Sequence, residues 1–497
     1  MIKTKNVVLV EKINNSDWPI FKCNEPSKTQ FWNKKIDQRF ETNQIVIREN
    51  LLRIGKNKQA PKKYAFLLLR SGLLMYQDTK IKGKIDLNLQ ILIKKIELIN
   101  EEDHNKQNIV AIRIQKYENC HIYIWNPDNQ TSTLNWYKKL AQFCVAQNFE
   151  GFYKIIETID QGAFSSVFLI SPLIPEESRN RKLAAKIYSK CLLQKISGKQ
   201  MKDFVTNECQ ILKLAKSDYI VELLEVIQLE DVVILILEYI QGGTLSNLLK
   251  QNEIHELMSS EICLQIILGL KEIHRCGYVH RDIKLDNILI AQFNPIQIKI
   301  IDFGFAEKIN KNELINKQGT PGYIAPELFD LAPYTESCEI FSLGILFYIL
   351  LCGNFPFRST NYEVLIERNK QCQIRLQLDE WKNISSSAQR MVQRMLEKDP
   401  IRRITFSELT ILLELHISNL KSKGSHSRQN LNILTKSTNI RGITYEIIEK
   451  SPSKLAQAIK DYYDDDIGVD ENSLNNYNLQ NLQQSCKFYN NQKWVFQ

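Results

Sequence analysis

The stretch that decides the fold reads His280-Arg281-Asp282-Ile283-Lys284-Leu285-Asp286-Asn287. Two further strings follow it along the chain, first Asp302-Phe303-Gly304 and then Gly319-Thr320-Pro321-Gly322-Tyr323-Ile324-Ala325-Pro326-Glu327. Around them, residues 153–416 change from runs rich in strand-forming residues to long helical stretches. Each string is short, so the information lies in their order and spacing.

Two weaker motifs precede this stretch. Residues 159–167 read Ile-Asp-Gln-Gly-Ala-Phe-Ser-Ser-Val and lie between two runs rich in strand formers, and Ala184-Ala185-Lys186-Ile187 follows. Glycine lets backbone N–H groups approach a phosphate closely, but this loop holds only one, Gly162. Taken alone, the loop favours a plain β-hairpin over a phosphate-binding loop.

Taken in order, these motifs resemble the signature set of eukaryotic-type Ser/Thr protein kinases. The string from His280 to Asn287 is similar to H-R-D-L-x-x-x-N. Lys284 and the string from Gly319 to Glu327 are closest to the calcium/calmodulin-dependent and AGC groups and differ from tyrosine kinases. The resemblance implies a bilobal α+β kinase fold over residues 153–416, with Arg403 paired to Glu327 in its helical lobe.

The resemblance also implies catalytic roles for the matching residues. Asp282 would accept or orient the proton of a substrate hydroxyl, and Lys284 would neutralise charge on the migrating phosphoryl group. Lys186 would hold the α- and β-phosphates of ATP and would be oriented by Glu208, which falls on a helical stretch.

A nucleotide and metal site follows from the same resemblance. Asn287 and Asp302 would ligate Mg²⁺, and the backbone at Glu238 and Ile240 would bind the adenine edge. The expected ATP-binding set is Asp160, Gly162, Phe164, Ser165, Val167, Ala184, Lys186, Glu238, Ile240, Asn287 and Asp302. The expected reaction is transfer of the ATP γ-phosphate to protein serine or threonine. Asp286 stands where basophilic relatives face a substrate arginine, so we expect basic residues near the phosphorylated site.

Three residues depart from the family pattern. Asp160 and Ser165 replace two loop glycines, and Glu339 replaces the aspartate that usually anchors the catalytic loop. The extra methylene of Glu339 is either absorbed or loosens His280. These departures keep a second interpretation open, a nucleotide-binding pseudokinase scaffold with a protein-binding N-terminal domain.

The segment between residues 305 and 318 contains no serine, threonine or tyrosine. Arg281 therefore has no phosphorylatable partner within it. Our hypothesis is that activation needs no phosphorylation of this segment, with Glu313 as a candidate substitute for phosphate.

Residues 44–149, which we call the front domain, show short β-rich runs closed by a predicted amphipathic helix at 134–148 that carries Trp136. This pattern resembles a pleckstrin-homology domain, a small antiparallel β-barrel capped by a C-terminal helix. A basic loop could contact phosphoinositides through Lys56, Lys58, Lys62 and Lys63. Ala65 occupies the place of a usual basic residue, so a merely solvated loop and a protein-binding surface stay open as alternatives.

Composition bounds the remaining possibilities. The chain has 497 residues, 43% hydrophobic and 24% charged, as is ordinary for globular proteins, and its net charge of +9 does not by itself indicate nucleic acid binding. No apolar run approaches the roughly 18 residues of a membrane span, and we expect no secretory signal. The 11 cysteines include no C-x-x-C pair, which favours free thiols in a reducing compartment. We expect a cytoplasmic protein, peripheral at membranes if the front domain binds lipid, with a basic arm at 1–43 and a largely linker or disordered tail at 417–497.

Overall fold

The computed structural model describes much of the chain between residues 45 and 425. The described residues are 45–55, 61–69, 72–77, 80–87, 91–99, 108–117, 120–149, 151–162, 165–173, 181–189, 200–229, 231–251, 254–309, 319–330, 332–376 and 379–425. They belong to two compact units. The first runs to Gln210 and includes Glu222–Tyr239, and the second comprises Ile211–Val221 and the chain from Ile240 onward.

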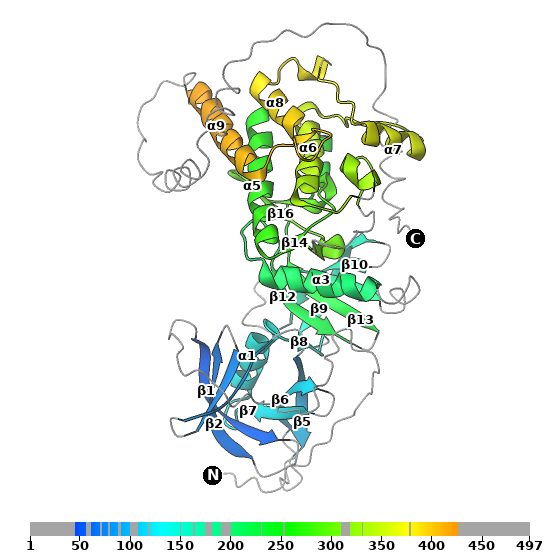
Figure 1. Cartoon of the computed structure of the whole chain (residues 1–497). Coiled ribbons are helices and arrows are strands. Elements are labelled where there is room, and N and C mark those ends of the chain that lie inside the picture. The colour runs from blue at the N-terminus through cyan, green and yellow to red at the C-terminus, as the bar shows by residue number, and fades with distance from the viewer. Residues whose placement is uncertain are drawn as a thin grey trace. The chain divides into compact units, whose positions relative to one another are not determined.

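The first unit begins with an antiparallel sheet and one helix (Figure 1). Its elements are β1 (Ile45–Gly55), β2 (Lys62–Leu69), β3 (Gly72–Gln77), β4 (Lys80–Ile85), β5 (Leu92–Ile99), β6 (Asn108–Tyr117), β7 (Cys120–Trp125) and α1 (Gln130–Ala141). Neighbouring strands follow the order β4-β3-β2-β1-β7-β6-β5. The pairings do not show a ladder between β4 and β5 in the described residues, so the closed barrel stays a prediction.

Trp136 on α1 anchors the helix to this sheet. Its side chain is fully buried and meets Phe66 of β2 edge-on, with ring centroids 6.5 Å apart. Its indole Nε1 donates a hydrogen bond of 2.6 Å to Glu49 of β1, which also accepts from Ser132 at the start of the helix. A buried indole needs such an acceptor, so this contact fixes the position of α1 along β1.

The helix lies a few residues earlier than the predicted range of 134–148. Asn129 caps its N-terminus by accepting from the backbone N–H of Ser132, because an Asx side chain satisfies a free amide of the first turn. The helix ends at Ala141, and Val145 and Ala146 already belong to a strand.

That strand, β8 (Val145–Ala146), is hydrogen-bonded on both sides. It runs parallel to β5, with Val145 opposite Leu92, and parallel to β12 (Leu223–Gln228), with Val145 opposite Val226. Both residues of β8 are completely buried, so their backbone N–H and C=O groups cannot bond to water. The two ladders supply the hydrogen-bond partners instead. The strands β1–β7, which we call the front strands, therefore join β8, β12 and four further strands in one continuous sheet. The further strands are β9 (Tyr153–Gln161), β10 (Ser165–Pro172), β11 (Leu183–Ser189) and β13 (Val232–Glu238), and the order is β4-β3-β2-β1-β7-β6-β5-β8-β12-β13-β11-β10-β9.

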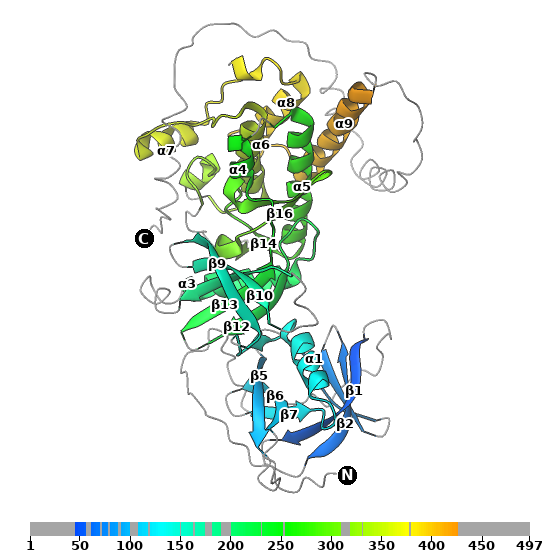
Figure 2. The same ribbon diagram turned by 180° about the vertical axis from the view of Figure 1, so that it is seen from behind.

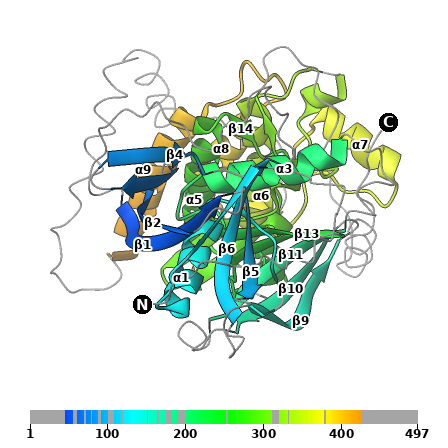
Figure 3. The ribbon, with the colours of Figure 1, turned by 90° about the horizontal axis from the view of Figure 1, so that it is seen from below.

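Five strands form the other end of this continuous sheet. They are β9, β10, β11, β12 and β13, and Figure 3 shows β9, β10, β11 and β13 side by side. One face of this part of the sheet shares a hydrophobic core with the front strands, since Ala185 and Ile227 cluster with Trp136. Tyr137 of α1 also stacks on Phe152, with centroids 5.1 Å apart.

The helix α3 (Gln200–Leu214) begins in the first unit and ends in the second, which is mainly helical (Figure 2). The second unit contains α4 (Leu245–Gln251), α5 (Glu256–Arg275), β14 (Tyr278–Val279), η2 (Leu285–Asn287), β15 (Ile288–Phe293), β16 (Ile296–Ile300), η3 (Phe303–Phe305), β17 (Glu307–Lys308), η4 (Pro326–Asp330), α6 (Glu336–Cys352), α7 (Tyr362–Gln371), η5 (Asp379–Trp381), α8 (Ser386–Met395) and α9 (Phe406–Ser425).

The core of the second unit is built around α6, which packs against α5 and α8. Nearly every residue of α6 is buried, and Gly344 lets α8 approach closely. A Cβ at position 344 would lie 2.8 Å from the side chain of Leu396, closer than real Cβ contacts allow. None of the helices in the described part of the chain combines the length and apolar character of a membrane span.

The helix α9 passes through the expected boundary at residues 416 and 417. It continues to Ser425, and Ile417 is buried while Lys421 forms a 2.8 Å ion pair with Glu261 of α5. The start of the predicted tail is therefore helical, and residues 426–497 lie outside the described residues.

Candidate active site

Lys186 and Glu208 meet inside the first unit. Lys186 lies on β11 and Glu208 on α3, and the Nζ–Oε1 distance is 2.8 Å. Both residues are buried, at 8% and 1% exposure, so the pair is shielded from water. A buried charge is tolerated only when it is paired, and each residue supplies the partner of the other.

Three of the expected nucleotide residues share one face of this sheet. Val167 of β10 lies directly opposite Lys186 of β11, and Ala184 lies two residues before Lys186. Opposite residues and alternate residues of an antiparallel sheet point to the same side. The sheet therefore presents Val167, Ala184 and Lys186 together.

The loop between β9 and β10 is tight where it can be described. The backbone N–H of Gly162 donates a 2.8 Å hydrogen bond to the carbonyl of Ser165, and a Cβ at 162 would lie 3.3 Å from that oxygen. The carboxylate of Asp160 accepts from the backbone N–H of Gln161 at 2.9 Å. Asp160 is therefore engaged with its own backbone, and Phe164 lies outside the described residues.

The two residues expected to bind the adenine edge, Glu238 and Ile240, fall in different units. Glu238 ends β13, and its backbone N–H donates to Glu222 at 3.1 Å, while its carboxylate accepts from the N–H of Glu222 at 2.8 Å. Ile240 belongs to the second unit and is half-buried. Asp282, Lys284, Asn287 and Asp302 also belong to the second unit, and each half of the predicted site is assembled internally.

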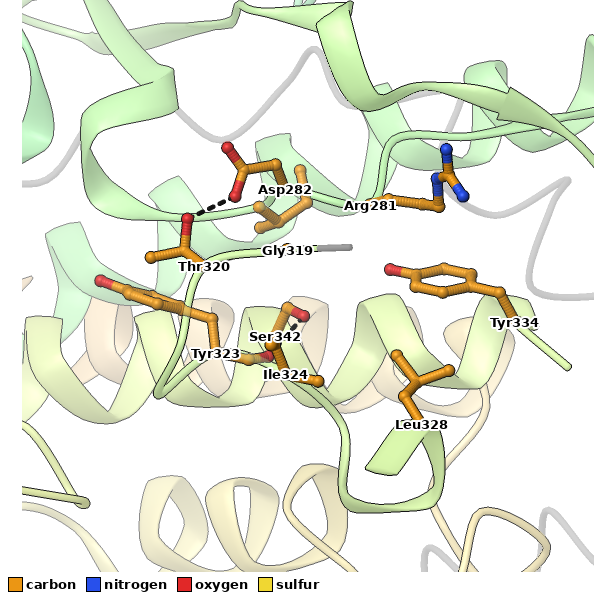
Figure 4. A pocket seen from close by; sticks show the side chains of 10 residues that line it. Arg281, Asp282, Gly319, Thr320, Tyr323, Ile324, Leu328, Tyr334 and Ser342 are labelled. Atoms are coloured by element: carbon orange, nitrogen blue, oxygen red, sulfur yellow. Dashed lines mark hydrogen bonds between the residues drawn. The ribbon is translucent and has the colours of Figure 1, made fainter. Parts of the chain in front are cut away.

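Asp282 is the centre of the part of the predicted site that lies in the second unit (Figure 4). Thr320 donates to its Oδ1 at 2.6 Å, and Figure 4 shows this bond as a dashed line. Lys284 Nζ donates to its Oδ2 at 2.7 Å. Asn287 Nδ2 donates to the same Oδ2 at 2.9 Å, and Lys284 also reaches Thr320 at 2.8 Å. The predicted residues Asp282, Lys284 and Asn287 thus form one network.

The surroundings keep Asp282 ionised. Burial alone would raise the pKa of this carboxyl, but the charge and hydrogen bond of Lys284 and the hydrogen bond of Thr320 outweigh burial and lower it. The pKa of Lys284 is raised, because its attraction to Asp282 outweighs the opposing effect of burial. The network therefore holds a carboxylate and an ammonium group at neutral pH.

Asn287 and Asp302 are brought together by the backbone. The N–H of Ile301, next to Asp302, donates to the carbonyl of Asn287 at 2.9 Å. The side-chain nitrogen of Asn287 donates to Asp282, which leaves its amide oxygen as an acceptor. A carboxylate and an amide oxygen are oxygen donors of the kind that a hard cation such as Mg²⁺ takes, so these two residue types fit the expected metal.

Asp302 also carries a strained backbone. Its φ is 61° and its ψ 75°, in the left-handed region that non-glycine residues rarely adopt. The next residue, Phe303, is fully buried against His280, with ring centroids 4.8 Å apart, and His280 contacts the carbonyl of Ile301 at 3.1 Å. This packing holds the strained turn in place.

Glu339 of α6 anchors the catalytic loop. Its Oε1 accepts from the backbone N–H groups of His280 and Arg281 at 2.5 and 2.9 Å, and its Oε2 contacts His274 Nε2. The carboxylate is fully buried. The longer side chain of Glu339 therefore still binds both N–H groups, and its extra methylene does not loosen His280.

Arg281 has a carboxylate partner that sequence reasoning missed. Its Nη2 lies 2.6 Å from Glu307 of β17, and its Nε donates to the carbonyl of Phe305 at 2.7 Å. Glu313, the residue considered for this role, lies outside the described residues. The usable signal was proximity in sequence, since Glu307 is the first acidic residue after Gly304.

Arg403 and Glu327 form a two-pronged ion pair. The two Nη atoms of Arg403 donate to the two carboxylate oxygens of Glu327 at 2.7 and 2.9 Å. Such parallel bonds fix both groups in one plane. They connect the chain just before α9 to the end of the Gly319–Glu327 string.

Comparisons with known proteins agree with this architecture. The sequence model of the protein kinase domain family matches residues 153–411. The chain therefore belongs to the protein kinase family.

Individual relatives are 30% to 31% identical to this chain over the aligned part. The chain is 30% identical over 260 residues to a protein of Plasmodium falciparum named "Probable serine/threonine-protein kinase 2". The alignment covers 52% of this chain and 49% of that protein, so the chain spans about half the length of this relative. It is 31% identical over 262 residues to "Calcium/calmodulin-dependent protein kinase type 1B" of Rattus norvegicus and of Mus musculus, covering 52% of this chain and 74% of each relative.

The pair of His274 and Glu339 predicts a pH dependence of stability. Burial would lower the pKa of His274, but the charge and hydrogen bond of Glu339 outweigh it and raise this pKa. A raised histidine pKa gives stability that is complete below about pH 6.5 and is lost as the pH rises through the folded-state value. We expect the difference in unfolding free energy between the wild type and His274→Gln to shrink from about pH 6 to about pH 9 in thermal denaturation.

The control is His255→Gln, which changes a histidine at the exposed start of α5. Its difference from the wild type should not follow the same trend. A His274→Gln difference that stays constant or grows with pH would contradict the assignment.

Proposed function

We propose that this chain is a Ser/Thr protein kinase that transfers the γ-phosphate of ATP to hydroxyl groups of proteins. The observation that carries the proposal is the network in which Thr320, Lys284 and Asn287 all bind the carboxylate of Asp282. The family membership and the names of the relatives support the same conclusion.

The chemistry follows from these positions. A substrate hydroxyl donates its proton to Asp282, which is ionised, while Lys284 offsets negative charge on the transferred group. A bond forms between the hydroxyl oxygen and the γ-phosphorus, and the bond from that phosphorus to the β–γ bridging oxygen breaks. Mg²⁺, when bound, neutralises phosphate charge, and Asn287 and Asp302 would hold it.

Lys186, paired with Glu208, binds the phosphates of the nucleotide. Lys186 binds the α- and β-phosphates, and Glu208 keeps its ammonium group in place. Val167 and Ala184 lie on the same sheet face and contact the adenine side of the nucleotide. Glu238 and Ile240 offer backbone groups to the adenine edge.

The same contacts weigh against the pseudokinase alternative. That interpretation drew on Asp160, Ser165 and Glu339. Glu339 makes the hydrogen bonds to the catalytic loop that the family aspartate would make, and Asp160 is bonded to its own backbone. A scaffold without catalysis would not need the carboxylate of Asp282 to accept hydrogen bonds from three partners.

We further propose that the segment after Gly304 needs no phosphorylation. A phosphate would order the segment by pairing with Arg281, and Glu307 already occupies that guanidinium. A carboxylate of the chain itself therefore takes the place of an added charge.

We also propose that the front domain recruits the kinase from the cytoplasm to phosphoinositide-containing membranes. Lys62 and Lys63 open β2 and are exposed, so their charges are available to an anionic surface. Lys56 and Lys58, the other members of the expected patch, lie outside the described residues. A protein partner in place of lipid is an outcome of the test below.

For catalysis, we expect Asp282→Asn to lower the rate of phosphate transfer to a basic Ser/Thr peptide by at least about a hundredfold, because the general base is lost. The assay measures radiolabel from ATP in the purified full chain. Asp379→Asn, which makes the same change at an exposed site of the second unit, should retain the wild-type rate. Equal labelling by the wild type and Asp282→Asn would refute the enzyme interpretation.

For activation, we expect Glu307→Gln to lower kcat/KM about fivefold, because the ion pair with Arg281 becomes a hydrogen bond from the guanidinium to a neutral amide. Glu363→Gln, on the exposed first turn of α7, is the control and should match the wild type. Phosphatase treatment should leave wild-type activity unchanged. A large gain in activity when an upstream kinase modifies Thr320 would count against this account.

For recruitment, we expect the full chain to float with vesicles that contain phosphatidylinositol phosphates. The double variant Lys62→Glu and Lys63→Glu should lose most of this binding, because each lysine near an anionic surface contributes about 1 kcal/mol. The control pair is Lys138→Glu and Lys139→Glu at the end of α1, which should still bind. Absence of flotation by the wild type would favour a protein partner.

A further inference from the structure

Glu208 is held by two residues of the same strand. Lys186 donates to its Oε1 at 2.8 Å, and the hydroxyl of Tyr188 donates to its Oε2. Tyr188 follows Lys186 by two positions on β11, so both side chains leave the same face of the strand. The two oxygens of one carboxylate are thus occupied from two points of β11.

The tyrosine also contacts the lysine. The Nζ atom of Lys186 lies 5.2 Å from the centroid of the Tyr188 ring, within the range of a cation–π interaction. Tyr188 is 6% exposed and Glu208 is 1% exposed, so the cluster is nearly dry. In such surroundings each hydrogen bond to a buried carboxylate is stronger than it would be in water.

We propose that Tyr188 is a positioning residue, which fixes Glu208, and with it the helix α3, in the orientation that pairs with Lys186. A carboxylate held by one bond can rotate about its terminal torsion, whereas one held at both oxygens cannot. The ion pair is therefore held in place by contacts of the chain itself. The proposal rests on the proposed kinase function, because it assigns Tyr188 a place in the same site.

A second tyrosine supplies a matched comparison. Tyr153, at the start of β9, donates to Glu225 of β12 at 2.6 Å. Glu225 is also mostly buried, at 8% exposure, and lies in the same unit. Tyr153→Phe and Tyr188→Phe therefore each remove one hydroxyl bonded to a carboxylate, but only the second acts on Glu208.

The test compares both variants in the full chain. We expect Tyr188→Phe to lower kcat/KM for ATP about tenfold, the size of one lost charge-assisted hydrogen bond, and Tyr153→Phe to lower it less than about twofold. Hydrogen–deuterium exchange should show faster exchange of the α3 amides in Tyr188→Phe only. If both variants change activity equally and only in step with their melting temperatures, Tyr188 is merely structural and the proposal fails.

A double-variant cycle tests whether Tyr188 acts through Glu208. In a Glu208→Gln background, the further change Tyr188→Phe should add little to α3 exchange, because residues of one network are not additive. Full additivity would overturn the proposal. The exchange measurement needs no catalysis, so a wild type without kinase activity would refute the proposed function while still deciding whether Tyr188 holds α3.

Discussion

The buried carboxylate of Glu339 is the contact on which the second half of the site depends. It binds two successive backbone N–H groups, those of His280 and Arg281, and Arg281 has a φ of 67° that a side-chain-bearing residue adopts at a cost. The loop keeps this conformation because α6, which is buried on nearly all sides, holds the carboxylate rigidly. Asp282 takes its position from this loop.

Carboxylates hold both halves of the site, and each is held in turn. Glu339 is balanced by His274, Glu307 by Arg281, and Glu327 by Arg403. In the first unit, Glu208 has Lys186 and Tyr188. Burying an acidic group without a partner would cost several kcal/mol of stability. Removing one member of such a pair therefore destabilises the fold by more than the intact pair stabilises it. This explains why the longer Glu339 is tolerated: its methylene costs little while its charge stays matched.

The chemistry of the site could be predicted from sequence because its residues occur in ordered short strings. Asp282, Lys284 and Asn287 are neighbours along the chain and in space. The contact of Tyr188 with Glu208 depends on three-dimensional packing, and no string marks it. Glu307 was marked only by its closeness to Gly304 in the sequence. In the fold, the strand β5 is hard to predict from sequence because its lysines, Lys94 and Lys95, interrupt a regular alternation. Gly83 is of a residue type that usually marks a turn, but it lies inside β4 opposite a register shift.

The two-residue strand β8 has a thermodynamic consequence. Because β8 is bonded to β5 on one side and to β12 on the other, the strands β1–β7 cannot separate from the sheet that carries Lys186 without breaking one of these ladders and opening a common core. The two regions of the first unit should therefore melt in one cooperative transition. Any molecule captured by the front strands would then raise the melting temperature of the catalytic sheet as well, to the extent set by its concentration and affinity.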